Sequence, residues 1–280
     1  MSSWRRWVGI GAAVGIIAAL VPVIRGPVGS VSLKEPLSKL ERRIHRTNDA
    51  PPSLSGLDLS RLTLHPRRVT SPLSGGRTAE LTLDPELQRV TMRALHSYGI
   101  PEAGVVMMEA KTGKVLVYAS NVEKGEPFDV NVKATAPAAS VFKVVTAATL
   151  VEEAGLNAKT EQCYHGGKSR ILQSELEDDP REDKWCASMA TALGRSINVV
   201  FAKLAQKHLT PEQITTMGGA FGFGAPIPFV VQNQAPSIEM PAEPLEFARA
   251  AAGFWHTTLS PLAGALLAQT VANGGVSLQP

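Results

Sequence analysis

The strongest constraint on this chain is a serine and a lysine, Ser140 and Lys143, at the start of an apolar run with helical period. The run predicts a helix that ends at Gly155 and packs through Val141, Val144, Val145 and Ala148. Residues three apart on a helix lie on one face, so the hydroxyl and the amine are expected to meet. A buried, neutral lysine can take a serine proton, which predicts a nucleophile for acyl transfer; a capping serine beside a solvated lysine is the alternative.

A second polar pair, Ser196 and Asn198, stands at a break between two predicted helices, residues 187–195 and 198–207. Backbone released from helical pairing can aim such side chains into a cleft. Taken alone, the pair could equally be a helix cap.

Capping signals place three further helices. Asp84-Pro85 predicts a helix that ends at Gly99. Its expected buried face comprises Leu87, Val90, Ala94, Leu95 and Tyr98. Thr210-Pro211 and Ser260-Pro261 open two more helices by the same logic, and the second closes at Asn273-Gly274-Gly275. The sequence also predicts a β-hairpin, from β-prone runs over 104–108 and 115–118 that flank the turn Lys111-Thr112-Gly113.

Charge is unevenly distributed along the 280 residues, although the net charge is only +3. Residues 1–24 carry +2, residues 25–79 carry +6, and residues 80–280 carry −5. The part expected to fold is therefore acidic, which argues against nucleic acid as a partner.

The first 24 residues combine Arg5 and Arg6 with an apolar run from Trp7 to Ile24. This pattern predicts a retained export signal and single-pass membrane anchor, with a cleaved signal peptide or a buried helix as alternatives. Residues 25–79 are basic and rich in proline, serine and glycine, which predicts a poorly ordered stalk. Order is expected from about residue 80, so that residues 80–280 form the functional domain.

Cys163 and Cys186 are the only cysteines, and they are expected to form either one disulfide or two free thiols. His165 and His256 show no metal-ligand spacing, and they are expected at the surface or in packing. The acidic residues of the run Glu175-Leu176-Glu177-Asp178-Asp179 are expected in a solvated loop. Nothing in the sequence suggests a metal or an organic cofactor.

Several segments together resemble the transpeptidase domain of penicillin-binding proteins, over roughly residues 80–280. Ser140-Val141-Phe142-Lys143 is similar to the family's S-x-x-K box, and Ser196-Ile197-Asn198 to its S-x-N box. The supporting segments, in the family's order, are Thr82–Gln88, Lys111–Leu116 with Ala119-Ser120, Phe221–Gly224, Ser260–Leu262 and Ala272–Gly275. One departure is that Ala138-Ala139 stands where the family usually has Pro-Gly. The resemblance implies an α+β fold, with an antiparallel sheet flanked by helices and a mostly helical subdomain.

The resemblance also implies a chemistry. Ser140 would attack the D-Ala-D-Ala carbonyl of a peptidoglycan stem peptide, with Lys143 as general base. Ser196 would relay a proton to the leaving amine, and Asn198 would bind the substrate amide. An acceptor amine would then form the cross-link, and β-lactams would trap Ser140. The implied location is the cytoplasmic membrane, with the catalytic domain outside the cytoplasm and cell-wall assembly proteins as further partners.

The family's third box, a Lys-Thr-Gly strand after the S-x-N box, has no counterpart there. Lys111-Thr112-Gly113 precedes the serine and occupies a predicted turn, so it is not that box. We therefore expect the sequence to be incomplete at its C-terminus, without the last strands, and we expect this chain alone to form no stable adduct with a labelled penicillin. A D,D-carboxypeptidase, a serine β-lactamase and a non-catalytic wall-assembly scaffold or penicillin sensor are the alternative functions.

Overall fold

The computed structural model describes residues 53–167 and 170–280, and the predicted anchor over 1–24 lies outside this part. Seven α-helices are defined within the described residues: α2 Pro85–Ser97, α3 Lys143–Ala154, α4 Met189–Gly194, α5 Asn198–His208, α6 Pro211–Ala220, α7 Pro244–Ala251 and α8 Pro261–Ala272. None of these helices has the length and apolar character needed to cross a bilayer.

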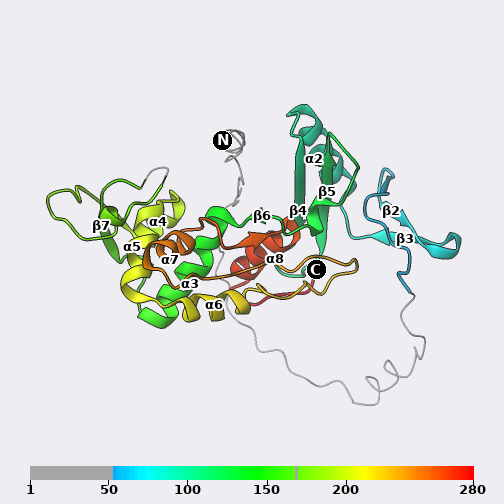
Figure 1. Ribbon diagram of the computed structural model, residues 1–280. Helices are drawn as coiled ribbons and strands as arrows, with labels where there is room; N and C mark the ends of the chain where they lie inside the picture. The colour runs from blue at the N-terminus through cyan, green and yellow to red at the C-terminus, as the bar shows by residue number, and fades with distance from the viewer. Residues whose placement is uncertain (1–52, 168–169) are drawn as a thin grey trace, which may run out of the picture. The chain divides into compact units, whose positions relative to one another are not determined.

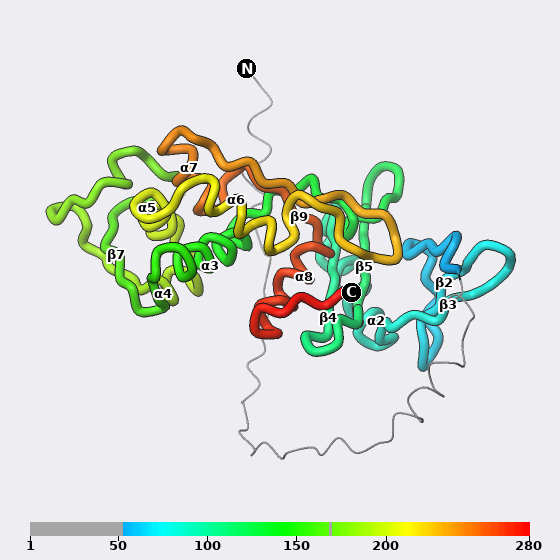
Figure 2. Tube along the Cα trace, turned by 90° about the horizontal axis from the view of Figure 1, so that it is seen from below, coloured from blue at the N-terminus to red at the C-terminus, as the bar shows by residue number. Residues whose placement is uncertain are grey.

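The strands of the described part pair only in antiparallel fashion (Figures 1 and 2). They are β1 Thr63–Leu64, β2 Val69–Pro72, β3 Thr78–Leu81, β4 Glu102–Met108, β5 Val115–Val122, β6 Ala136–Pro137, β7 Glu161–Tyr164, β8 Trp185–Ser188 and β9 Thr258–Leu259. The first three form one sheet, and β4–β5, β6–β9 and β7–β8 form three two-stranded sheets. Helices and antiparallel sheets together confirm the predicted α+β class.

The predicted stalk over 25–79 needs correction for the residues from 53 onward, while residues 25–52 lie outside the described part. Strands β1, β2 and β3 form a sheet here, and Leu59 and Val69 are buried. Both side chains pack in one cluster with Leu83, Val115 and Tyr118. Order therefore begins at least as early as residue 53, because a few apolar residues within a basic segment reach a core built by the hairpin that follows.

The hairpin β4–β5 and its covering helix α2 form as predicted, but α2 buries another face. Asp84 caps α2 by accepting hydrogen bonds from the backbone N–H groups of Glu86 and Leu87. Of the expected apolar face, Leu95 is buried, whereas Leu87, Val90 and Tyr98 are exposed. The buried partner of Leu95 one helical repeat earlier is Gln88, which bonds both backbone groups of Tyr118 on β5. Apolar periodicity misses this face because its central residue is polar.

The main core lies in the helical part and is built around α5. Every residue from Val199 to Ala205 is buried, and α5 contacts α3, α4 and α7. Phe142 at the entry to α3 packs edge-on against Phe223, with ring centroids 5.5 Å apart. In Figure 1 the helices α3, α5, α6 and α7 lie together, while α8 lies between them and the β4–β5 hairpin. This core thus lies directly beneath the start of α3 and the start of α5.

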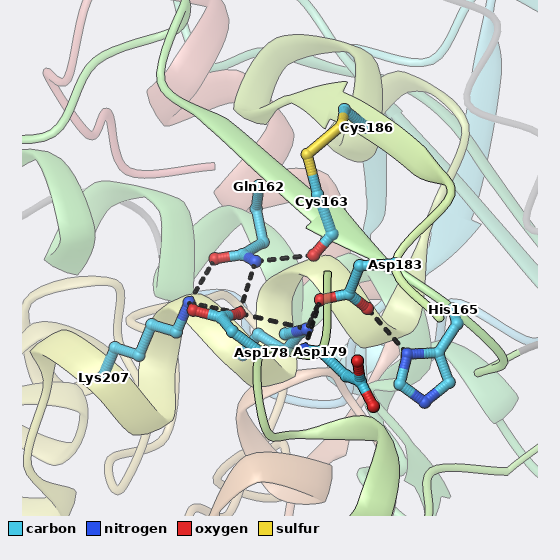
Figure 3. Close-up of a disulfide and its surroundings, with 9 residues drawn as sticks. Gln162, Cys163, His165, Asp178, Asp179, Asp183, Cys186 and Lys207 are labelled. Atoms are coloured by element: carbon cyan, nitrogen blue, oxygen red, sulfur yellow. Dashed lines mark hydrogen bonds and ion pairs between the residues drawn. A yellow bond between two sulfur atoms is a disulfide. The ribbon is translucent and has the colours of Figure 1, made fainter. Parts of the chain in front are cut away.

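Cys163 on β7 and Cys186 on β8 are directly opposite in the strand register and form a disulfide. This resolves the choice between one disulfide and two thiols. The acidic run 175–179 is not simply solvated: Glu175 accepts hydrogen bonds from the N–H groups of Gly167 and Leu172, and Asp178 pairs with Lys207 (Figure 3). These carboxylates fold the segment onto the rest of the chain.

Lys111-Thr112-Gly113 lies in the turn between β4 and β5, as predicted, and Gly113 has a φ of 76° there. The turn donates from the Gly113 N–H to the Glu109 carbonyl. Its glycine therefore serves the turn, and the tripeptide does not form a strand beside Ser140.

Candidate active site

Ser140 lies in a single 3₁₀ turn, Ala139–Phe142, that leads directly into α3. The residue before it, Ala139, has a φ of 50°, a left-handed conformation that favours glycine. Two contacts hold this turn from outside. The short strand β6 pairs with β9, and the Ala138 N–H donates to the Thr257 carbonyl. Ser140 itself is exposed, so the hydroxyl is presented to solvent on an anchored turn.

Gly253 packs directly against the nucleophile turn. A Cβ added to Gly253 would lie 2.1 Å from the Ala139 carbonyl oxygen and 3.3 Å from the Ser140 nitrogen. Gly253 also has a φ of 92°, which an L side chain rarely adopts. Sequence reasoning missed this position, because one glycine among 24 carries no signal of a contact with a residue more than 110 positions away.

Lys143 is the first residue of α3 and has no exposed surface. Its Nζ atom donates to Ser140 Oγ at 2.8 Å. Burial lowers the pKa of Lys143 to about 8, because removal from water disfavours the charged ammonium. A substantial fraction of the amine is therefore neutral near pH 8, which is the form that can accept a serine proton.

Ser196 comes from the tight turn that links α4 to α5, 56 residues after Ser140. Its φ of 54° is again left-handed. The turn is closed by backbone bonds from Ser196 to Leu193 and from Ile197 to Ala192. Ser196 Oγ donates to Ser140 Oγ at 2.6 Å, and Lys143 Nζ donates to Ser196 Oγ at 3.5 Å. The hydroxyls and the amine form a closed triangle.

Asn198 is the first residue of α5 and is half-buried. It stands two residues after Ser196, at the same entrance to α5. Its side-chain amide makes no hydrogen bond within the part of the chain that the structure describes. Three of the four predicted residues are thus in direct contact, and the fourth, Asn198, follows Ser196 by two positions.

An apolar cavity of about 310 Å³ is lined by Leu57, Leu83, Tyr118 and Phe229 among others, and Ser140 is not part of it. Among residues 53–167 and 170–280, no group of three or more histidine, cysteine, aspartate or glutamate side chains could hold a metal ion.

Comparison with known proteins identifies the family. The family model "penicillin binding protein transpeptidase domain" matches residues 103–280. The chain belongs to the penicillin-binding protein transpeptidase family. The match includes both the Ser140 turn and the Ser196 turn.

Two curated proteins illustrate the relationship. The peptidoglycan D,D-transpeptidase PbpA of Mycobacterium tuberculosis is 26% identical over 297 aligned positions, which cover 92% of this chain and 58% of that protein. Stage V sporulation protein D of Bacillus subtilis is 25% identical over 228 positions, covering 75% of this chain and 35% of that protein. The chain thus spans somewhat more than half of the first relative's length and about a third of the second's.

A solved transpeptidase-family structure shares the fold. The penicillin G acyl-enzyme complex of M. tuberculosis penicillin-binding protein A superposes with a TM-score of 0.58 at 23% sequence identity. The match covers 71% of this chain and 53% of that structure. At this identity the likeness supports the mixed helix and antiparallel-sheet architecture that the fold description gives.

Proposed function

We propose that this protein is a peptidoglycan D,D-transpeptidase that works through a serine acyl-enzyme. The observation that carries the proposal is the position of Ser140 Oγ, which accepts one hydrogen bond from the buried Lys143 amine and one from the Ser196 hydroxyl. A nucleophile in contact with a base, and a base in contact with a second proton carrier, is the arrangement that covalent acyl transfer requires.

In the proposed reaction, neutral Lys143 takes the hydroxyl proton as Ser140 Oγ forms a bond to the carbonyl carbon of the penultimate D-alanine. The carbon–nitrogen bond to the terminal D-alanine breaks, Ser196 passes its proton to the leaving amine, and the Lys143 ammonium returns the proton taken from Ser140 to Ser196. An amine of a second stem peptide then attacks the acyl-enzyme, forms the new amide and returns the proton to Ser140. Asn198 binds the substrate amide, and a β-lactam stops the sequence at the acyl-enzyme.

We further propose that residues 1–24 anchor the protein in the cytoplasmic membrane and that the catalytic domain faces away from the cytoplasm. The Arg5-Arg6 pair and the apolar run that follows support this topology. The Cys163–Cys186 disulfide agrees with it, because disulfides persist in oxidising compartments. Stem peptides and cell-wall assembly proteins are the expected partners there.

The first prediction is that Ser140 is the nucleophile, and it is tested on the protein expressed from its complete gene. A fluorescent penicillin should label the unaltered protein, and mass spectrometry should place the adduct on Ser140. Ser140→Ala should abolish labelling, because it removes the hydroxyl that forms the ester. Ser97→Ala is the matched control, since Ser97 is exposed at the end of α2 and bonds only the Arg93 carbonyl there.

An adduct on any other residue, or no adduct at all, would contradict this assignment, and no adduct would favour a non-catalytic scaffold. Release of the bound penicillin separates the remaining alternatives. Persistence for hours supports the transpeptidase, whereas release in seconds would point to a hydrolase on the same fold. Within the described residues, the side-chain partners of Ser140 and Lys143 include no carboxylate that could activate water.

A further inference from the structure

One face of α5 is covered by a segment that the proposed reaction does not use. Val199, Lys203 and Lys207 are spaced four residues apart, so they form a single stripe along this helix. Asn198 and Ser196 lie at the N-terminal end of the same helix. Whatever fixes this stripe also fixes the position of the two predicted site residues relative to Ser140.

The middle of the stripe is a buried ion pair. Lys203 has no exposed surface, and its Nζ lies 2.7 Å from Oδ2 of Asp183, which is only 5% exposed. The same amine donates to the Glu177 carbonyl at 3.0 Å. A lysine buried this completely needs such partners, because an unpaired buried charge is strongly destabilising. The Asp178 carboxylate lies 3.1 Å from the same amine, so the seating of α5 depends on residues 177, 178 and 183.

These three residues belong to a segment that we name the bracing segment, residues 170–186. It is attached to α5 again at Asp178, whose carboxylate lies 2.6 Å from Lys207 Nζ. At its start, Arg249 of α7 donates to the Ile171 carbonyl at 3.0 and 2.6 Å. The bracing segment thus bridges α5 and α7.

The N-terminal end of the stripe is covered by Gly167, which precedes the bracing segment in the sequence. A Cβ added to Gly167 would lie 2.4 Å from the Val199 Cβ, so the backbone of Gly167 rests on the first turn of α5. The Gly167 N–H donates to the Glu175 carboxylate of the bracing segment at 3.0 Å. This contact reaches the residue next to Asn198.

The disulfide links the C-terminal end of the bracing segment to β7. Cys186 ends the bracing segment on β8, and Cys163 lies opposite on β7. Figure 3 shows the disulfide, the Asp183–His165 contact and the Asp178–Lys207 pair in one neighbourhood. The bond therefore limits how far the carboxylates of the bracing segment can move from α5.

We propose that Lys203 and Asp183 are positioning residues for the Ser196–Asn198 turn, and that the Cys163–Cys186 disulfide keeps the bracing segment in place for that role. The role in acyl transfer rests on the proposed function. In the unaltered, oxidised protein the contacts of the bracing segment, together called the brace, fix the first turn of α5. When these contacts are lost, the Ser196–Asn198 turn shifts and Ser196 leaves its short contact with Ser140.

The second prediction tests this with a paired exchange, Lys203→Met with Asp183→Asn, which removes both charges and keeps similar volumes. Saturating acylation by the fluorescent penicillin should slow about tenfold, because a small displacement of a catalytic turn has a large effect on rate. The half-saturating penicillin concentration should change little. His208→Gln is the matched control on the same helix, and it should leave the rate nearly unchanged, since His208 is exposed and makes no side-chain hydrogen bond or ion pair within the described residues.

A second measurement does not depend on acylation. Amide hydrogen exchange over residues 199–202 should accelerate about tenfold in the paired variant, and in the unaltered protein after reduction of the disulfide. Titration of two thiols confirms reduction. Exchange in α2, which carries no residue of the brace, serves as the internal reference and should stay constant.

The outcomes are distinct. Unchanged exchange in residues 199–202, in both the reduced protein and the paired variant, would overturn the brace whatever the acylation rate. Faster exchange with an unchanged acylation rate would also overturn it as a positioning device. If the unaltered protein forms no acyl-enzyme, the proposed function fails, and exchange alone then decides whether the brace fixes this turn. An accelerated α2 would show general loosening and would count against a local brace.

Discussion

Residues with a left-handed backbone conformation cluster around Ser140. Within the described residues, the non-glycine positions with positive φ are Ala139, Ser196, Trp255 and His256. The first two flank or form the hydroxyl triangle, and the other two follow Gly253, which touches the Ala139 carbonyl. Such conformations cost about 1–3 kcal/mol each and persist only where the surroundings impose them. Their clustering at one place supports a functional role for that place.

The third prediction concerns Ala139, which stands where the family usually has glycine. Ala139→Gly should raise the free energy of unfolding by about 0.5–1 kcal/mol, because relief of the left-handed Cβ exceeds the entropy that glycine adds to the unfolded chain. Ala139 is exposed, so its methyl group contributes little by burial. Urea unfolding followed by circular dichroism measures the change.

The neighbouring alanine provides the control for this substitution. Ala138 has a φ of −62° and is 3% exposed. Ala138→Gly should therefore lower the free energy of unfolding by about 1 kcal/mol, through both lost burial and added chain entropy. Equal effects of the two substitutions would show that the conformation of Ala139 carries no strain.

The fourth prediction follows from the lowered pKa of Lys143. The acylation rate constant should rise with pH along a limb with an apparent pKa of about 8, as the amine becomes neutral. The stability effect has the same sign. Between about pH 8 and the ordinary lysine pKa, the unfolded chain binds more protons than the folded one, so this group makes unfolding less favourable as pH rises.

The measurement is penicillin acylation between pH 6 and pH 10, at about half-unit steps, on protein shown to remain folded throughout. Lys143→Arg should remove the limb and nearly all activity, because arginine stays charged in this range. A rate that is flat across pH 8, with Lys143 intact, would rule out this amine as the base.

At the scale of elements, helix ends were predictable and helix faces less so. The Asp84, Thr210 and Ser260 caps all form, because each depends on a side chain reaching a backbone group two or three residues away. The predicted buried face of α2 was wrong, because the inward-facing residue Gln88 is polar and the apolar residues Leu87, Val90 and Tyr98 are exposed. A hydrogen-bonding partner on a distant strand cannot be read from periodicity.

The fifth prediction is that Gln88→Ala lowers the free energy of unfolding by about 2–3 kcal/mol, because it leaves the N–H and carbonyl of Tyr118 without their partner in a buried place. Arg89→Ala, on the exposed side of the same helix, should change it by less than about 0.5 kcal/mol. Chemical denaturation of the two variants under identical conditions makes the comparison. Similar values for both would mean that the Gln88 amide contributes no net stability.

The Lys203–Asp183 pair shows another limit of sequence reading. A lysine at this position of a helix reads as solvated charge, and the acidic run before β8 reads as a solvated loop. Only the folded arrangement of β7, β8 and α5 brings them together. The disulfide could be proposed from the cysteine count, but its geometric role could not.

At the scale of the whole described unit, the site is a meeting of distant segments. Ser140 and Lys143 could be paired from sequence, since helix geometry links residues three apart. Ser196 could be joined to them only through the family resemblance, because 56 residues and several elements intervene. The structure supplies what local rules lack: the core around α5, which brings the α4–α5 turn against the start of α3.

The glycine at position 253 has a practical consequence for protein engineering. Because no carbon substituent fits between Gly253 and the Ala139 carbonyl, the segments around 139 and 253 behave as one module, although they are 114 positions apart in the sequence. A graft of the reactive turn onto another scaffold, or a chimera joined anywhere between these segments, must carry both halves together. Recombination that mixes them from different parents would place a foreign surface against the reactive turn.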